Sequence, residues 1–132
     1  MTGEDLDTFA TGEHSLLHAV CAYVFRSLRA VVPFQRMCIA TVEGEPTLVR
    51  LRWQRTLLEG PVLHRNYTLP LTATSLGQVA DGATSRVIND LGAYLADTPR
   101  SASSRAVFDQ GVRASLTSPL TVRGELLGFL FL

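Results

Sequence analysis

The first regular pattern of apolar positions runs from His14 to Val32. Apolar residues recur there every three or four positions, at Leu17, Val20, Val24, Leu28 and Val31. This is the period of an α-helix with one apolar face. Pro33 follows, and it should end the helix because proline lacks a backbone amide donor. We therefore predict a long amphipathic helix, preceded by a flexible polar leader over residues 1–13.

After Pro33 the pattern becomes that of β-strands. Residues 34–42 are densely apolar, residues 43–46 have turn chemistry, and residues 48–55 alternate between apolar and polar. In a strand this alternation places Val49, Leu51 and Trp53 on one side, in the core, and the intervening polar residues on the other. The two segments are therefore predicted to form an antiparallel hairpin with one half-solvated face.

The rest of the chain predicts shorter elements and a final hairpin. We expect a strand over 67–71, a helix capped by Thr74 or Ser75 and ending at Gly82, a strand over 86–89, and a long polar loop containing a helix over 101–110. Residues 114–122 and 126–132 flank Gly124 and predict a tight hairpin. The last strand is apolar apart from Gly128, so it should lie in the middle of a covered sheet.

This order of elements predicts an α+β fold, a mainly antiparallel sheet with helices on its faces. A chain of 132 residues, 46% hydrophobic, is large enough to form one domain without a metal or disulfide. The net charge of zero gives no general attraction for nucleic acid or membranes. No apolar run reaches the length of a membrane helix and no signal peptide is evident, so a cytoplasmic location is expected.

The basic residues are unusual in being all arginine, with no lysine in the chain. They are scattered from Arg26 to Arg123 rather than clustered as in a binding patch. We therefore attribute them to a GC-rich genome and not to an anion-binding surface.

Several short phrases, taken in order, resemble the GAF domain family. Residues 69–71 and 75–79 resemble the approach to its short middle helix, residues 86–91 the strand and acidic turn that follow, and residues 111–116, 119–120, 124–125 and 127–128 the closing hairpin. The resemblance covers residues 16–132. It implies a GAF-like (profilin-like) fold, with a central six-stranded antiparallel sheet and helices on its faces.

The resemblance also implies a function. GAF domains are regulatory small-molecule-sensing and dimerisation domains of bacterial signalling proteins, and the favoured host is a two-component sensor histidine kinase. The alternatives are a diguanylate cyclase, a phosphohydrolase or a phosphatase as host, a dimerisation spacer without a ligand, a PAS-like sensor, and a methionine sulfoxide reductase on the same scaffold. Only the reductase would make this fragment itself an enzyme.

The family implies two partners besides a small molecule: a covalently linked output domain and a second copy of the chain. We expect the homodimer to pair through the first helix, at Leu17, Val20, Val24 and Leu28. Family members usually carry a further helix after the last strand, and this chain ends at Leu132, where that helix would begin. Residues 14–132 are therefore expected to form the domain without its C-terminal helix.

By position, the family's ligand pocket would lie between the sheet and the middle loop-and-helix layer. The resemblance places six candidates there: Asn89, Asp90, Tyr94, Phe108, Arg113 and Ser115. Asn89 and Asp90 rank first, because an amide and a carboxylate at a strand end can orient a ligand. A structural role, with Asp90 capping a turn and Asn89 bonding a loop amide, competes and is favoured. The pattern of cyclic-nucleotide-binding members, with its lysine, is missing.

No catalytic constellation or metal site is evident in the sequence. His14 and His18 are four residues apart on the first helix but have no third ligand. His64 does not match the family's haem ligand, and neither Cys21 nor Cys38 lies where bilin-binding members carry their cysteine. Haem, bilin and metal are therefore disfavoured. Both cysteines lie in apolar segments and should be buried thiols, and their accessibility tests the reductase alternative.

Overall fold

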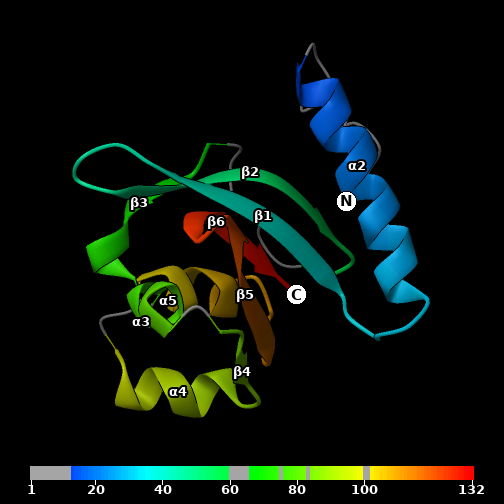
Figure 1. The fold of residues 1–132 in the computed structure, drawn as a ribbon. Coiled ribbons are helices and arrows are strands. Elements are labelled where there is room, and N and C mark those ends of the chain that lie inside the picture. The colour runs from blue at the N-terminus through cyan, green and yellow to red at the C-terminus, as the bar shows by residue number, and fades with distance from the viewer. Residues whose placement is uncertain (1–12, 60–65, 75, 83, 100–101) are drawn as a thin grey trace.

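The computed structural model describes residues 13–59, 66–74, 76–82, 84–99 and 102–132. Most of the predicted leader, residues 1–12, and His64 lie outside this part of the chain. The elements are labelled in Figure 1: α2 (Glu13–Arg29), β1 (Arg36–Glu43), β2 (Leu48–Thr56), β3 (Thr68–Pro70), the 3-10 turn η1 (Leu71–Ala73), α3 (Leu76–Gly82), β4 (Arg86–Ile88), α4 (Leu91–Asp97), α5 (Ala102–Asp109), β5 (Ser115–Val122) and β6 (Glu125–Phe131).

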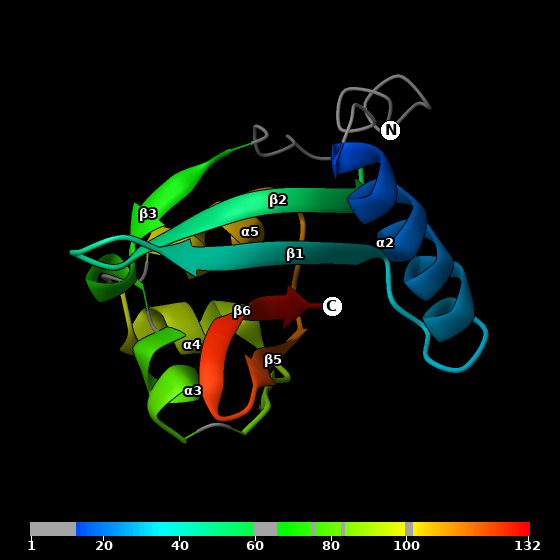
Figure 2. The ribbon, with the colours of Figure 1, turned by 45° about the horizontal axis from the view of Figure 1, so that its top comes forward.

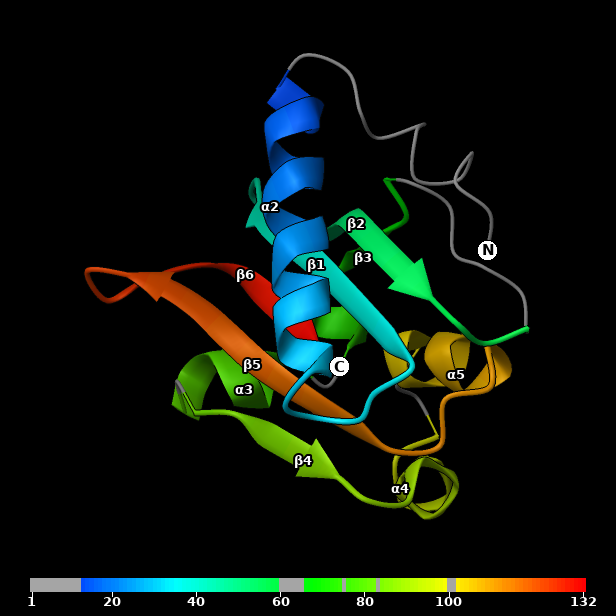
Figure 3. The ribbon, with the colours of Figure 1, turned by 90° about the vertical axis from the view of Figure 1, so that its right-hand side faces the viewer.

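The strands form one six-stranded antiparallel sheet in the order β3-β2-β1-β6-β5-β4. Helix α2 lies on one face, and α3, α4 and α5 lie on the other (Figures 2 and 3). The predicted α+β class is confirmed. The apolar strand β6 is central, between β1 and β5, as its composition predicted.

Helix α2 packs on the sheet through a face only partly predicted: Leu17, Val24 and Leu28 of the predicted stripe are partly buried, while Val20 and Val31 are exposed. Cys21, Ala22 and Phe25 form a cluster with Met37 and Trp53, the latter two fully buried. The helix ends at Arg29 rather than at Val32, and in the turn that follows the amides of residues 31 and 32 both bond to the carbonyl of residue 28. The predicted core position of Trp53 is confirmed.

The expected alternation along β2 is interrupted by a β-bulge. Ile39 pairs with Trp53 while Ala40 pairs with Leu51, so Arg52 has no partner of its own in β1. A bulge reverses which face the following residues occupy. Val49 therefore packs against α3, while Trp53 packs against α2. The prediction that Val49, Leu51 and Trp53 share one face was wrong, because sequence periodicity does not reveal the extra residue.

Helix α4 occupies a region that was predicted to be a polar loop. The Asp90 carboxylate accepts a hydrogen bond from the Ala93 amide at 3.0 Å and caps the helix. Leu91 and Leu95, one turn apart, are buried and pack with Ile88. The helix has only seven residues and contains a glycine, so its period was too short to recognise.

Two glycines with different surroundings test how tightly β6 fits against β1. A Cβ added at Gly128 would collide with the Ala40 carbonyl oxygen and lie 3.0 Å from Thr41 Cα. A Cβ added at Gly77, in α3, would have no atom within 4 Å. The sheet therefore requires glycine at position 128. Helix α3 has no such requirement at position 77.

We predict that Gly128→Ala lowers the free energy of unfolding by about 1–3 kcal/mol, as expected of overpacking. Gly77→Ala, the matched control, should raise it by about 0.5–1 kcal/mol because alanine is the better helix former. Urea unfolding followed by circular dichroism measures both. Equal stability of the two variants would contradict the close approach of β6 to β1.

Candidate functional site

A cavity of about 950 Å³ lies on the face of the sheet that carries α5. Its walls come from β1 and β2 on one side, from β4 and β5 on the other, and from α5 and the segment that follows it. The volume is at the upper end of the range typical of sites for drug-sized ligands. Most of its wall is apolar, and includes Leu51, Ile88, Leu91, Val107, Val112 and Phe131.

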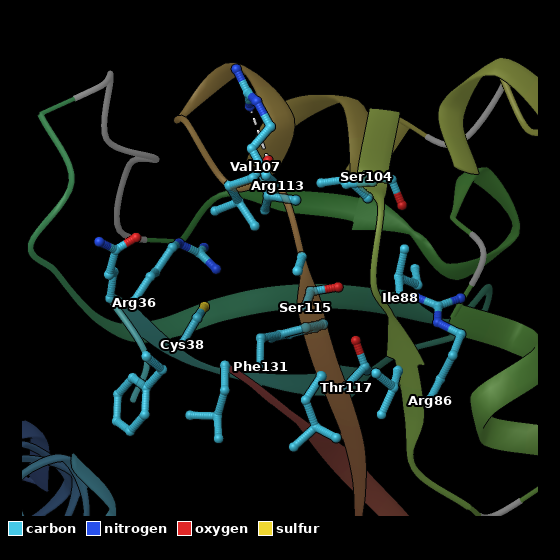
Figure 4. A pocket seen from close by; sticks show the side chains of 18 of the residues that line it. Arg36, Cys38, Arg86, Ile88, Ser104, Val107, Arg113, Ser115, Thr117 and Phe131 are labelled. Carbon is cyan, nitrogen blue, oxygen red and sulfur yellow. Dashed lines mark hydrogen bonds between the residues drawn. The ribbon is translucent and has the colours of Figure 1, made fainter. Parts of the chain in front are cut away.

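Polar side chains are placed at separate points around this apolar wall. Arg36 and Cys38, alternate residues of β1, lie at one end, and Arg86 of β4 lies at the other (Figure 4). Ser115 and Thr117, alternate residues of β5, lie between them. The period of two along each strand turns both pairs toward the cavity. The site therefore combines an apolar body with a few polar groups contributed by both halves of the sheet.

The charge of the cavity is positive. Four arginines line it, and no acidic side chain is among the described residues of the wall. Three of the four make contacts elsewhere. Arg29 donates to the Phe34 carbonyl, the Arg86 guanidinium lies 5.5 Å from the Tyr94 ring centre, and the Arg113 guanidinium lies 3.9 Å from the Phe108 ring centre.

Arg36 differs from these three. Its side chain is only 6% exposed, and its Nε atom has no hydrogen-bond partner. Within the described part of the chain, no carboxylate lies at ion-pair distance from it. A buried guanidinium is normally paired, so this is the most conspicuous charge of the cavity.

The structure brings three of the six predicted pocket residues to the cavity wall. Asn89, Arg113 and Ser115 line it, with Asn89 and Arg113 exposed and the Arg113 guanidinium turned toward the Phe108 carbonyl. Tyr94 and Phe108 do not line it, and instead pack against the α4 cluster. Asp90 caps α4, which is the structural role that the sequence favoured.

The six named candidates did not include Arg36, Cys38, Ser104 or Thr117, which also line the cavity. The sequence did contain a signal for Arg36. It alternates with Cys38 and Ala40 along a largely apolar strand, so the three side chains lie on the same, inward face. Attributing all the arginines to genome composition did not single out Arg36 as a binding residue. Ser104 and Thr117 carry no such signal, because hydroxyl residues occur on exposed and buried surfaces alike.

Both cysteines are free thiols and are buried, as predicted. Burial, with a smaller contribution from the nearby Cys38, raises the pKa of the Cys21 thiol to about 11. Burial also raises the pKa of Cys38, although the neighbouring Arg36 guanidinium opposes this rise. Both groups are therefore neutral thiols at pH 7, the less reactive form.

The histidines do not form a metal site in the described part of the chain. His18 Nδ1 accepts a hydrogen bond from Trp53 Nε1 at 3.2 Å, which ties the imidazole to the core. The side chain of His14 is outside the described residues. Among the residues described, no group of three or more His, Cys, Asp or Glu could hold a metal ion. None of the described helices is long and apolar enough to span a membrane.

Comparison with known proteins gives matches in structure only. No protein-family model matches the sequence, and no curated protein matches it significantly. Among solved structures, the chain is similar to the GAF domain of a two-component sensor histidine kinase from Bacillus halodurans, with a TM-score of 0.65 and 18% identity over 87% of this chain and 74% of that one. The fold is that of a GAF domain.

Two further solved structures share this GAF fold. One is the phycocyanobilin-bound GAF domain from a cyanobacterial phytochrome, with a TM-score of 0.59 and 15% identity over 92% of this chain and 79% of that one. The other is a free methionine-R-sulfoxide reductase from Neisseria meningitidis in complex with its substrate. The TM-score is 0.61, with 15% identity over 98% of this chain and 68% of that one. Neighbours of the GAF fold thus include a sensor kinase domain, a bilin-binding domain and an enzyme.

We predict that both thiols of the native protein resist a disulfide reagent such as 5,5′-dithiobis(2-nitrobenzoate) at pH 7 and react once urea unfolds the chain. The raised pKa values also make stability depend on pH. Folding favours the neutral thiols, so this contribution is complete below the ordinary pKa of 9.0 and is lost as the pH rises toward about 11.

The free energy of unfolding should therefore fall more steeply over this pH range in the wild type than in a Cys21→Ala/Cys38→Ala double variant, which has no thiol to ionise. Unfolding in urea at a series of pH values measures the difference. A rapid reaction of either thiol at pH 7 in the native protein would contradict the prediction and favour the reductase alternative.

Proposed function

We propose that this GAF domain is the regulatory, small-molecule-sensing part of a bacterial signalling protein, in the cytoplasm, with a sensor histidine kinase as the favoured host. The cavity supports the proposal, because its size and mixed lining suit a small organic ligand. A ligand bound between the sheet and α5 would favour one arrangement of these elements over another. An output domain linked to this chain could respond to that difference.

The choice of host rests on the similarity to the histidine kinase domain from Bacillus halodurans. A diguanylate cyclase, a phosphohydrolase or a phosphatase would use the same kind of sensing domain, and the domain encoded beside this chain distinguishes them. A spacer without a ligand is the other alternative. The cavity argues against it, because a spacer has no need for a large opening in its core.

The enzyme alternative is supported by the similarity to the methionine-R-sulfoxide reductase. That chemistry needs a reactive thiol in the substrate cavity, and Cys38 does line the cavity. Its pKa is raised by burial, which keeps it in the neutral form and weakens it as a nucleophile. We therefore favour a sensing role over a catalytic one.

The proposal includes a small-molecule ligand other than haem, bilin or metal. One structural neighbour is bound to phycocyanobilin. Both cysteines of this chain lie in α2 and β1, far along the sequence from the middle region with α4 and α5, where bilin-binding members carry their cysteine. Most polar groups of the described cavity wall are arginines, hydroxyls and amides, which bond to organic anions and hydroxyl groups more readily than they ligate metals.

Filling the cavity tests the sensing function. We predict that Ser115→Trp, which places an indole in the cavity, abolishes the thermal stabilisation by any compound that raises the melting temperature of the wild type. Thr121→Trp adds the same ring at an exposed position of the same strand and should leave that stabilisation intact. At a ligand concentration 100 times Kd, about 2.7 kcal/mol of stabilisation is expected.

A library of metabolites screened by thermal shift, together with native mass spectrometry of the purified protein, supplies the compounds. If compounds stabilise both tryptophan variants as they do the wild type, the cavity is not the ligand site.

We also propose that two copies of the chain pair through α2. Of the four residues predicted for this role, Leu17, Val24 and Leu28 pack against the core, and Val20 is 52% exposed. The exposed apolar residues on the same outer side of the helix are Leu16, at 71%, and Tyr23, at 65%. At intervals of four and three residues they form one ridge with Val20, which a second copy of the helix could cover.

We predict that Val20→Glu weakens this homodimer at least tenfold, because it places a charge in an apolar contact. Val122→Glu is the control, since Val122 is similarly exposed, at 54%, but lies at the β5–β6 turn. Sedimentation equilibrium over a range of concentrations measures the dissociation constant. A monomeric wild type, or equal weakening by both variants, would contradict pairing through α2.

A further inference from the structure

The strongest unexplained feature of the cavity is the guanidinium of Arg36. The residue begins β1, next to the centre of the sheet, and its side chain shares the cavity face of the strand with Cys38 (Figure 4). It is 6% exposed, its Nε atom makes no hydrogen bond, and no described carboxylate pairs with it. Among the residues that the structure describes, no carboxylate therefore compensates this buried positive charge.

A charge in this position opposes folding unless something else neutralises it. Burial removes most of the water that would solvate a guanidinium, and the lost solvation is recovered only through hydrogen bonds and an opposite charge. The Cys38 thiol is a polar neighbour that forms a hydrogen bond with Arg36. It does not supply a negative charge at pH 7, because burial raises the pKa of this thiol. The counter-ion is therefore expected to come from outside the chain.

The other arginines of the wall do not need such an anion. Arg113 donates to the carbonyls of Phe108 and Val112 and stacks on the Phe108 ring. Arg86 Nη1 lies 3.4 Å from the Tyr94 hydroxyl, and its guanidinium stacks on the same ring. Of the four arginines in the described wall, Arg36 alone is buried, so it is the charge at one end that most needs an anion, with hydroxyl groups and apolar side chains beyond it.

We propose that the cavity binds a monoanionic carboxylic acid, whose carboxylate pairs with Arg36 and whose apolar body extends along the cavity toward Ser115 and Thr117. This inference rests on the proposed ligand-sensing function and names the chemical class of the ligand.

Two properties of the site favour this class over other anions. A guanidinium matches a planar carboxylate with two parallel hydrogen bonds, and one guanidinium neutralises one negative charge. A phosphate dianion would need a second buried cation beside Arg36, and the other arginine of that end, Arg29, is exposed and donates to the Phe34 carbonyl. A cavity of about 950 Å³ is also far larger than a bare inorganic anion needs, and its apolar wall would be left without contacts.

The experiment uses the fluorescent probe N-phenyl-1-naphthylamine, which is uncharged and brightens in apolar cavities. Alkyl and aryl carboxylates, such as decanoate and 4-phenylbutyrate, compete with the probe, and each is compared with its primary amide, decanamide or 4-phenylbutanamide. The amides keep the apolar body and remove the charge. At least one carboxylate should bind the wild type ten or more times as tightly as its amide.

Three variants assign this preference to Arg36. Arg36→Met and Arg36→Gln should bind the probe as the wild type does, with the preference for carboxylate reduced to about one. Arg113→Gln removes another arginine of the wall and should retain the preference. In the absence of ligand, Arg36→Met should melt at the same temperature as the wild type or higher, because an uncompensated buried charge is removed. A merely structural arginine would instead lower the melting temperature and leave the preference unchanged.

The outcomes separate this inference from the function on which it rests. If Ser115→Trp does not reduce binding of the probe, or if the probe does not bind, the cavity is not a ligand site and both proposals fall. If the probe binds in the cavity but no carboxylate outcompetes its amide, the ligand class is wrong and the sensing function stands. If Arg36→Met still prefers a carboxylate to its amide, Arg36 does not bind the carboxylate, and again only the ligand class is wrong.

Discussion

The pairing of β1 with β6 is the contact on which the rest of this structure depends. It joins the first strand of the sheet to the last, residues 38–41 against residues 128–131, across most of the chain. On one side of this seam β2 and β3 extend the sheet, and on the other β5 and β4 do. Gly128 permits the close approach, since any side chain there would meet the backbone of β1. Without the seam the sheet would be divided into two three-stranded halves, and β1 and β6 would each become an unpaired edge strand.

The candidate site exists because the seam brings the two halves together. Arg36 and Cys38 come from one half, and Ser115 and Thr117 from the other, so neither half contains the site alone. The sheet also has two different faces. One is sealed by α2 around Trp53 and Phe25, while the other carries three short helices and leaves a cavity. The two faces of the sheet therefore differ, because one is closed by the helix α2 and the other borders the cavity.

Sequence reasoning was most successful where a local pattern carried the information. The long helix, both hairpins and the central position of β6 followed from periodicity, turn residues and an uninterrupted apolar strand. It failed where several weak signals had to be combined. Helix α4 is short, and its cap, Asp90, was read as a turn. The bulge at Arg52 changed the face of Trp53 relative to Leu51, and only the pairing with β1 reveals it. Half of the six predicted pocket residues line the cavity, since position in a family does not specify which side of a short helix faces inward.

By itself, the sequence determined the class of fold, the order of most elements and the burial of both cysteines, because these properties follow from the spacing of apolar residues over a few turns or strands. Only the tertiary structure decided that Arg36 is an interior charge with no carboxylate partner among the described residues. The sequence shows an arginine among apolar residues, but whether a carboxylate lies opposite depends on strands and helices that are remote along the chain. The electrostatic environment of a side chain is set by its neighbours in space, and pairing across the β1–β6 seam decides which residues those neighbours are.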